Sequence, residues 1–111
     1  MDTQDVIQGT YHSATGTVQG FLPIQPYKRR VTNIVIQGPA RSTFKMYRGT
    51  RIEPSMQITS TPPAGGGDNT YDSTTDGAPV AIGPGEQVLA VWSGGATTTG
   101  STGTAIVRSV V

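Results

Sequence analysis

An acidic loop contains the residue types that could hold a metal ion. Residues 72–77, DSTTDG, place side-chain oxygens at alternate positions and a glycine at the sixth, as a calcium loop begins. The twelfth position of such a loop needs a bidentate glutamate, but here it is Gly83. Asp68, Asp72 and Asp76 are therefore only weak metal candidates. We expect them to be solvated turn residues, and we expect no metal and no cofactor.

Nucleophilic catalysis has little support in the sequence. The chain has no cysteine, which excludes thiolate nucleophiles and cysteine-ligated metals, and a Ser-His-Asp relay would have to use its one histidine, His12. Ser93 lacks the G-x-S-x-G elbow that presents a catalytic serine. The turn GPGE at residues 83–86 is followed by no P-loop lysine, and Pro84 removes an amide donor. We expect no enzymatic activity and no catalytic residue.

Basic side chains are concentrated in one part of the chain. Seven of the eight lysines and arginines lie between residues 28 and 51, a segment without any acidic residue. Such a segment could bind phosphates, but the net charge is only +1 and no nucleic-acid-binding motif is present. We expect a protein partner with an acidic surface and no nucleic acid. The predicted interface residues are Asp2, Asp5, Lys28, Arg29, Arg30, Arg41, Lys45, Arg48 and Arg51.

The elements that position these residues are expected to be strands. The 15 glycines and 8 prolines, with many threonines and valines between them, oppose helices and favour short strands joined by turns. We predict an all-β fold, a single antiparallel β-sandwich, jelly-roll-like or immunoglobulin-like, of about 7–9 short strands. It forms one domain over residues 1–111, with residues 1–10 as a partner-binding N-terminal arm.

Strand positions follow from β-branched and apolar residues that lie between turn signals. Two stretches of small polar residues, 62–77 and 93–103, are expected to be long loops. The predicted strands are residues 18–24, 31–37, 42–48, 55–61, 79–82, 87–92 and 104–110.

The apolar strand QVLAVW contains the only tryptophan of the chain. Alternation along this strand places Val88, Ala90 and Trp92 on one face. We therefore predict that Trp92 lies in the core, where a tryptophan of a β-sandwich ordinarily lies. Phe44 and Met46 share a face of another predicted strand and are the expected opposing partners.

Several segments together resemble a known class of proteins. Residues 31–51, VTNIVIQGPARSTFKMYRGTR, lead from a VTNI strand through a turn to a strand that ends in MYRG. DNTYDSTTD (residues 68–76), PVAIGPGEQVLAVWSGG (79–95) and TAIV (104–107) follow. This layout resembles small β-sandwich virion structural proteins of tailed bacteriophages, particularly those of actinobacteria, of the capsid decoration, head-fibre or minor tail type. The likeness covers residues 31–108 as a pattern of hydrophobic residues, glycines and turns.

The resemblance implies a non-enzymatic structural role on a virion. The function it favours is that of a capsid decoration or cement protein, which binds the lattice of the major capsid protein and stabilises the shell. Such a protein would be made in the host cytoplasm, lie on the capsid surface without a membrane, and form a homo-oligomer, with a trimer favoured. The alternatives are a minor tail or head–tail connector protein, or a carbohydrate-binding β-sandwich module in which Trp92 and tyrosines stack on sugars.

Overall fold

The computed structural model describes residues 2–48, 59–60, 69–72, 80–95 and 97–111; for 48, 59–60 and 69–72 the description covers the backbone. These residues form strands and no helix. In chain order the strands are β1 (Asp2–His12), β2 (Thr17–Leu22), β3 (Arg29–Gln37), β4 (Thr43–Arg48), β5 (Thr59–Ser60), β6 (Asn69–Asp72), β7 (Val80–Ile82), β8 (Val88–Ser93) and β9 (Thr102–Val110).

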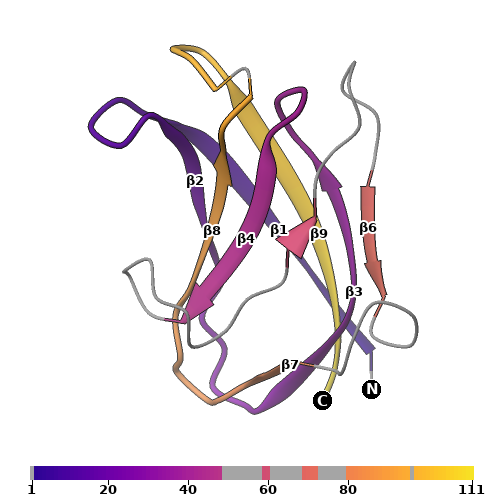
Figure 1. The fold of residues 1–111 in the computed structure, drawn as a ribbon. Helices are drawn as coiled ribbons and strands as arrows, with labels where there is room; N and C mark the ends of the chain where they lie inside the picture. The colour runs from indigo at the N-terminus through magenta and orange to yellow at the C-terminus, as the bar shows by residue number, and fades with distance from the viewer. Residues whose placement is uncertain (1, 49–58, 61–68, 73–79, 96) are drawn as a thin grey trace.

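All the described strands belong to one antiparallel sheet. Its order is β5-β4-β8-β2-β1-β9-β3-β6, and β7 pairs with the first residues of β3. The sheet curls so strongly that β5 and β6, the two ends of this order, come within 8 Å of each other between Cα atoms. Figure 1 shows β2, β8 and β4 as one wall of the curl and β9, β3 and β6 as the other. The predicted all-β, antiparallel fold is confirmed, in the form of a half-barrel rather than a clear two-layer sandwich.

The described residues of the predicted N-terminal arm form a strand of the sheet, β1, instead of projecting from the domain, and partner binding by this segment stays a prediction. Residues Asp2–Thr10 pair with β9 in an unbroken antiparallel ladder. Ile7 and Gly9 of this strand are buried, so β1 also contributes to the core. The strand escaped prediction because Gln4, Gln8 and other polar residues occupy its outward positions, and Asp5 one of its inward positions.

The concave side of the sheet encloses the hydrophobic core. Trp92 is fully buried there, as predicted, together with Val88 and Ala90 of the same strand. Phe44 and Met46 lie in the same core, but on β4, which pairs directly with β8. They are therefore neighbours of Trp92 in one sheet, whereas the sandwich prediction placed them in an opposing layer.

A bulge in β3 keeps the apolar residues of this strand on the concave side. Val31 pairs with Ser109, but Asn33 pairs with Arg108, so Thr32 is an extra residue in the ladder. The extra residue reverses the alternation of the strand. Val31 before the bulge and Ile34 after it are consequently both fully buried, although their positions differ by three, which in a regular strand would place them on opposite faces.

The indole of Trp92 crosses the interior from β8 and lies against glycines on the opposite wall. Gly9 of β1 and Gly103 of β9 are register partners, and Gly38 directly follows the last residue of β3. A Cβ atom would lie 2.6 Å from Trp92 Cζ3 at Gly9, and 2.7 Å from Cε2 at Gly103. Both distances are far inside van der Waals contact. We call Gly9, Gly38 and Gly103 the glycine platform.

Trp92 also contacts its own wall. The ring of Phe44, which is its register partner on β4, packs edge-on at 4.9 Å between centroids and an interplanar angle of 63°. Edge-to-face aromatic pairs add roughly 0.5–1.5 kcal/mol to the free energy gained by burial. Because the indole is fully buried, Trp92 is not available to stack on a sugar.

The glycine platform predicts a specific effect of a single methyl group. Gly103→Ala places a Cβ atom within the space of the indole, and we expect a loss of about 1–3 kcal/mol in the free energy of unfolding, as for other overpacked cores. Gly83→Ala is the matched control, since no atom lies within 4 Å of a Cβ atom there. Urea denaturation measures both changes.

A second substitution tests whether the loss of stability in Gly103→Ala comes from contact with Trp92. Trp92→Phe shortens the ring system, so Gly103→Ala should cost less in the Trp92→Phe background than in the wild type, which gives a measurable coupling between the two positions. Equal costs for Gly103→Ala and Gly83→Ala, with no coupling to Trp92, would contradict the contact.

Candidate interaction surface

The structure separates the basic residues that the sequence places in one segment. Lys28 and Arg30 are exposed at the beginning of β3, whereas Arg41 is exposed in the turn that follows the strand, with φ at 63°. The nine residues of β3 place these groups about 30 Å apart. Lys45 lies on β4, which is near the other end of the strand order. The described basic side chains therefore do not form one continuous patch.

Arg29 is not a surface residue, and its prediction as an exposed interface residue is wrong. Its side chain is 1% exposed. The Nη1 group donates to Asp5 Oδ2 at 2.5 Å, and the Nη2 group donates to the main-chain oxygen of Pro23 at 2.6 Å. The predicted interface residues Arg29 and Asp5 are thus each other's ion-pair partners, and the pair belongs to the interior.

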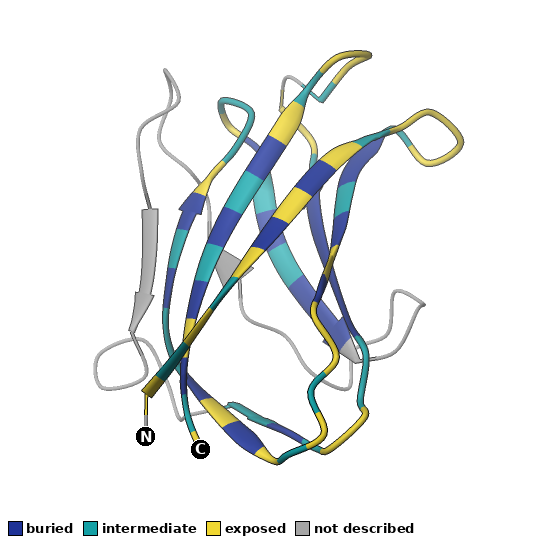
Figure 2. Ribbon diagram, turned by 180° about the vertical axis from the view of Figure 1, so that it is seen from behind, coloured by how far each residue is buried: buried dark blue, intermediate teal, exposed yellow. Residues whose placement is uncertain are grey.

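The Arg29 guanidinium lies where two neighbouring strands separate. The ladder between β1 and β2 covers only Thr10–His12, and β2 then follows β8 away from β1. Figure 2 shows the two strands joined at the hairpin and diverging toward the N-terminus. Asp5 lies on the diverging part of β1, and Pro23 directly follows β2. Arg29 therefore connects the two strands across the region in which they share no backbone ladder.

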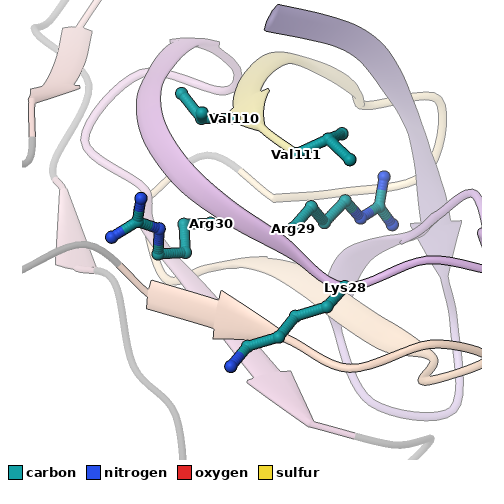
Figure 3. A pocket seen from close by; sticks show the side chains of 5 residues that line it. All are labelled: Lys28, Arg29, Arg30, Val110 and Val111. Carbon is teal, nitrogen blue, oxygen red and sulfur yellow. The ribbon is translucent and has the colours of Figure 1, made fainter. Parts of the chain in front are cut away.

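A pocket of about 370 Å³ adjoins this ion pair and is lined by Lys28, Arg29, Arg30, Val110 and Val111. Figure 3 shows that the side chains of Lys28 and Arg30 extend away from the guanidinium of Arg29. Convergent donors are what binds a carboxylate or phosphate group strongly. These three cations point in different directions, so the pocket does not present a preformed anion site.

The outer face of β1, β9 and β3 is exposed and carries few charges over its central part. Figure 2 shows β1 and β9 nearest the viewer, and no described segment covers them. We call each set of three register partners across β1, β9 and β3 a rung. The middle rung is apolar and consists of Val6, Ile106 and Val35. The rungs on either side are polar and consist of Gln8, Thr104 and Gln37, and of Gln4, Arg108 and Asn33.

The outer face combines exposed apolar groups with uncharged hydrogen-bonding groups. Val6 is 44% exposed, and Ile106 and Val35 are partly exposed beside it. Arg108 is the one charged side chain in the three rungs. Sequence reasoning passed over these residues because it followed the charges. The alternation Gln-x-Val-x-Gln at residues 4–8 is the signal that could have indicated an exposed strand face.

Some predicted site residues lie outside the described part of the chain. Arg51, Asp68 and Asp76 are in this group, and for Arg48 and Asp72 only the backbone is described. Among the residues that the structure describes, no group of histidine and acidic side chains has the arrangement of a metal site. The weak calcium candidates therefore stay a prediction from sequence.

Comparison of the chain with known protein families and with curated proteins gave no match. In the part of the chain that the structure describes, no helix has the length and apolar character needed to cross a membrane.

The buried ion pair predicts unequal effects for the two aspartates of β1. Asp5→Ala leaves the guanidinium of Arg29 buried without its counter-charge, and breaking a buried pair in this way typically costs about 3–5 kcal/mol of stability. Asp2→Ala removes an exposed carboxylate from the same strand and should change stability by less than about 0.5 kcal/mol. Thermal and urea unfolding measure both.

A double variant separates loss of the pair from loss of one partner. Asp5→Leu with Arg29→Met removes both charges, so it should be more stable than Asp5→Ala alone. An Asp5→Ala variant as stable as Asp2→Ala would show that Arg29 is adequately solvated without its partner.

Proposed function

We propose that this chain is a non-enzymatic structural protein of a bacteriophage virion. Within that class we assign it to the capsid decoration proteins, which bind the lattice of the major capsid protein and stabilise the shell. The sequence resemblance supports the virion class. The structural observation that carries the proposal is the outer face of β1, β9 and β3, which no other described segment covers and whose three central rungs contain a single charged side chain, Arg108.

The chemistry of this face suits a protein partner. Protein interfaces commonly have an apolar centre with few charges and a polar rim. The Val6, Ile106 and Val35 rung would supply the apolar centre, and the glutamine side chains on either side would supply donors and acceptors. Amide groups are less costly to bury than charges, because each can be satisfied by a hydrogen bond from the partner.

A small domain of this kind gains stability from attachment. Any partner that binds the folded state but not the unfolded state stabilises the folded state by mass action. The gain is reciprocal, because a folded domain that contacts two capsid subunits also resists their separation. The domain thus acts at the capsid surface as a cement, and several copies on one lattice multiply the effect.

Two other functions compete with decoration. A minor tail or head–tail connector protein would share the fold, but connectors form closed rings of about 6 or 12 copies, whereas a decoration protein occupies a particle in tens to hundreds of copies. Quantitative mass spectrometry of purified particles decides between them. A carbohydrate-binding module would need a sugar platform other than the buried Trp92.

Attachment should depend on the apolar rung of the outer face. Ile106→Glu places a charge at its centre, and we expect binding to undecorated capsids to weaken by at least about tenfold, the usual result of losing a central interface residue. Thr99→Glu is the matched control, because it adds the same charge to an exposed turn between β8 and β9. Sedimentation of capsids with labelled protein gives both affinities.

A charge-reversal variant in the same binding experiment tests the contribution of the basic residues. Lys28→Glu with Arg30→Glu reverses two exposed charges at the rim, so it should change mainly the association rate and its salt dependence. If Ile106→Glu binds as the wild type does while this charge reversal abolishes binding, the outer face is not the attachment site. Absence of the chain from purified virions would end the proposal.

A further inference from the structure

Three buried polar atoms lie at the end of the interior that contains the ion pair of Arg29. Thr3 Oγ1, Ser109 Oγ and Arg29 Nε are each buried and make no hydrogen bond within the described part of the chain. The fourth buried side-chain atom of this kind, Trp92 Nε1, lies elsewhere, against Gly38 of the glycine platform. Native proteins rarely leave a buried donor or acceptor unsatisfied, because the group has lost its hydration and gained nothing in return. Three such groups at one place therefore point to a ligand.

The two hydroxyl groups face each other across one ladder. Thr3 of β1 and Ser109 of β9 are register partners, and directly opposite residues of an antiparallel pair point to the same face of the sheet. Val31 of β3 is the other register partner of Ser109 and is fully buried, so this face is the concave one. The Cβ atoms of opposite residues lie roughly 4.5–5.5 Å apart. The hydroxyls are therefore neighbours, although they do not hydrogen-bond to each other.

The side chain of Arg29 crosses the interior beside this pair of hydroxyls. Arg29 lies two residues before Val31 on β3, and its guanidinium donates to Asp5, which lies two residues after Thr3 on β1. Because β9 lies between these two strands, Ser109 is midway along the diagonal from Arg29 to Asp5. An arginine that spans this diagonal carries its Nε atom close to Ser109. The unpartnered N–H group and the two unpartnered hydroxyls therefore belong to one small site.

We propose that one internal water molecule bridges Thr3 Oγ1, Ser109 Oγ and Arg29 Nε. The water accepts a hydrogen bond from the Nε–H group and forms one further hydrogen bond with each hydroxyl. Three hydrogen bonds are the usual number for a buried water, and they satisfy all three groups. The site joins β1, β9 and β3 through side chains at the end of the interior where β1 and β2 share no ladder.

The chemistry of the site favours water over an ion. The charge of Arg29 is already compensated by Asp5, so an anion would lie near a carboxylate without a free positive charge to bind. A cation would meet the guanidinium. Each hydroxyl can donate as well as accept, and water is the smallest molecule that also does both. The short side chains of Thr3 and Ser109 suit a molecule of that size beside the long stem of Arg29.

Oxygen-17 relaxation dispersion of the protein in solution tests the site directly. The method detects water molecules that stay bound for longer than the protein takes to tumble, and it does not respond to exchanging hydroxyl protons. Thr3→Val with Ser109→Ala removes two of the three partners while nearly preserving side-chain size. We therefore expect this double variant to hold one long-lived water fewer than the wild type.

The matched control is a second pair of register partners on the same two strands. Thr10 of β1 and Thr102 of β9 also lie opposite each other, but both are exposed. Thr10→Val with Thr102→Val should leave the number of long-lived waters as it is in the wild type. The inference is independent of attachment to capsids, since every measurement uses the isolated protein.

Urea unfolding gives a second readout, in which the sign of the effect decides. If the water is bound, Thr3→Val and Ser109→Ala should each raise the equilibrium constant of unfolding about fivefold, the effect of one lost hydrogen bond. The double variant should lose less than the product of the two effects, because both substitutions release the same water. An unsatisfied hydroxyl is costly, so its removal would lower the constant instead. Equal numbers of long-lived waters in the wild type and the Thr3→Val, Ser109→Ala variant overturn the proposal, as does a lowered unfolding constant in either single variant.

Discussion

The contact between the Trp92 indole and the glycine platform is the constraint on which the half-barrel depends. A curled sheet has no second layer to fill its interior, so a large side chain from one wall must reach the other. Trp92 does so from β8, and only a wall without side chains at that point can receive it. The register pair Gly9 and Gly103 provides this surface, since a Cβ atom at either would overlap the ring. Gly38 extends it beyond β3.

The opposite end of the interior contains a buried ion pair beside the apolar core. The strong curl that brings the glycine platform to Trp92 also makes β1 leave β2 after a short hairpin ladder. Arg29 occupies that region with hydrogen bonds to Asp5 and to the Pro23 main chain. The planar guanidinium of Arg29 has several N–H donors and can therefore hydrogen-bond to two strands at once, which the ammonium group of a lysine could not do as well.

Much of the fold could be predicted from the sequence, because burial leaves a clear pattern. The strands around Ile34, Phe44 and Trp92 were predicted within two residues of their ends, and the burial of Trp92 followed from alternation. The strand β1 was missed because a half-exposed strand with polar residues on both faces lacks that pattern. Arg29 was misplaced for a related reason: its partner Asp5 is 24 residues distant, and no local signal distinguishes a buried arginine from an exposed one.

The indole of Trp92 packs against glycine backbone on the far wall. Proton NMR of the native protein tests this packing directly, because aromatic ring currents shift nearby protons. We predict strong upfield shifts for α protons of Gly9, Gly38 and Gly103, with nuclear Overhauser contacts from each to the indole protons. The α protons of Gly83 should show neither. Ordinary shifts at all three platform glycines, without contacts to Trp92, would contradict the account.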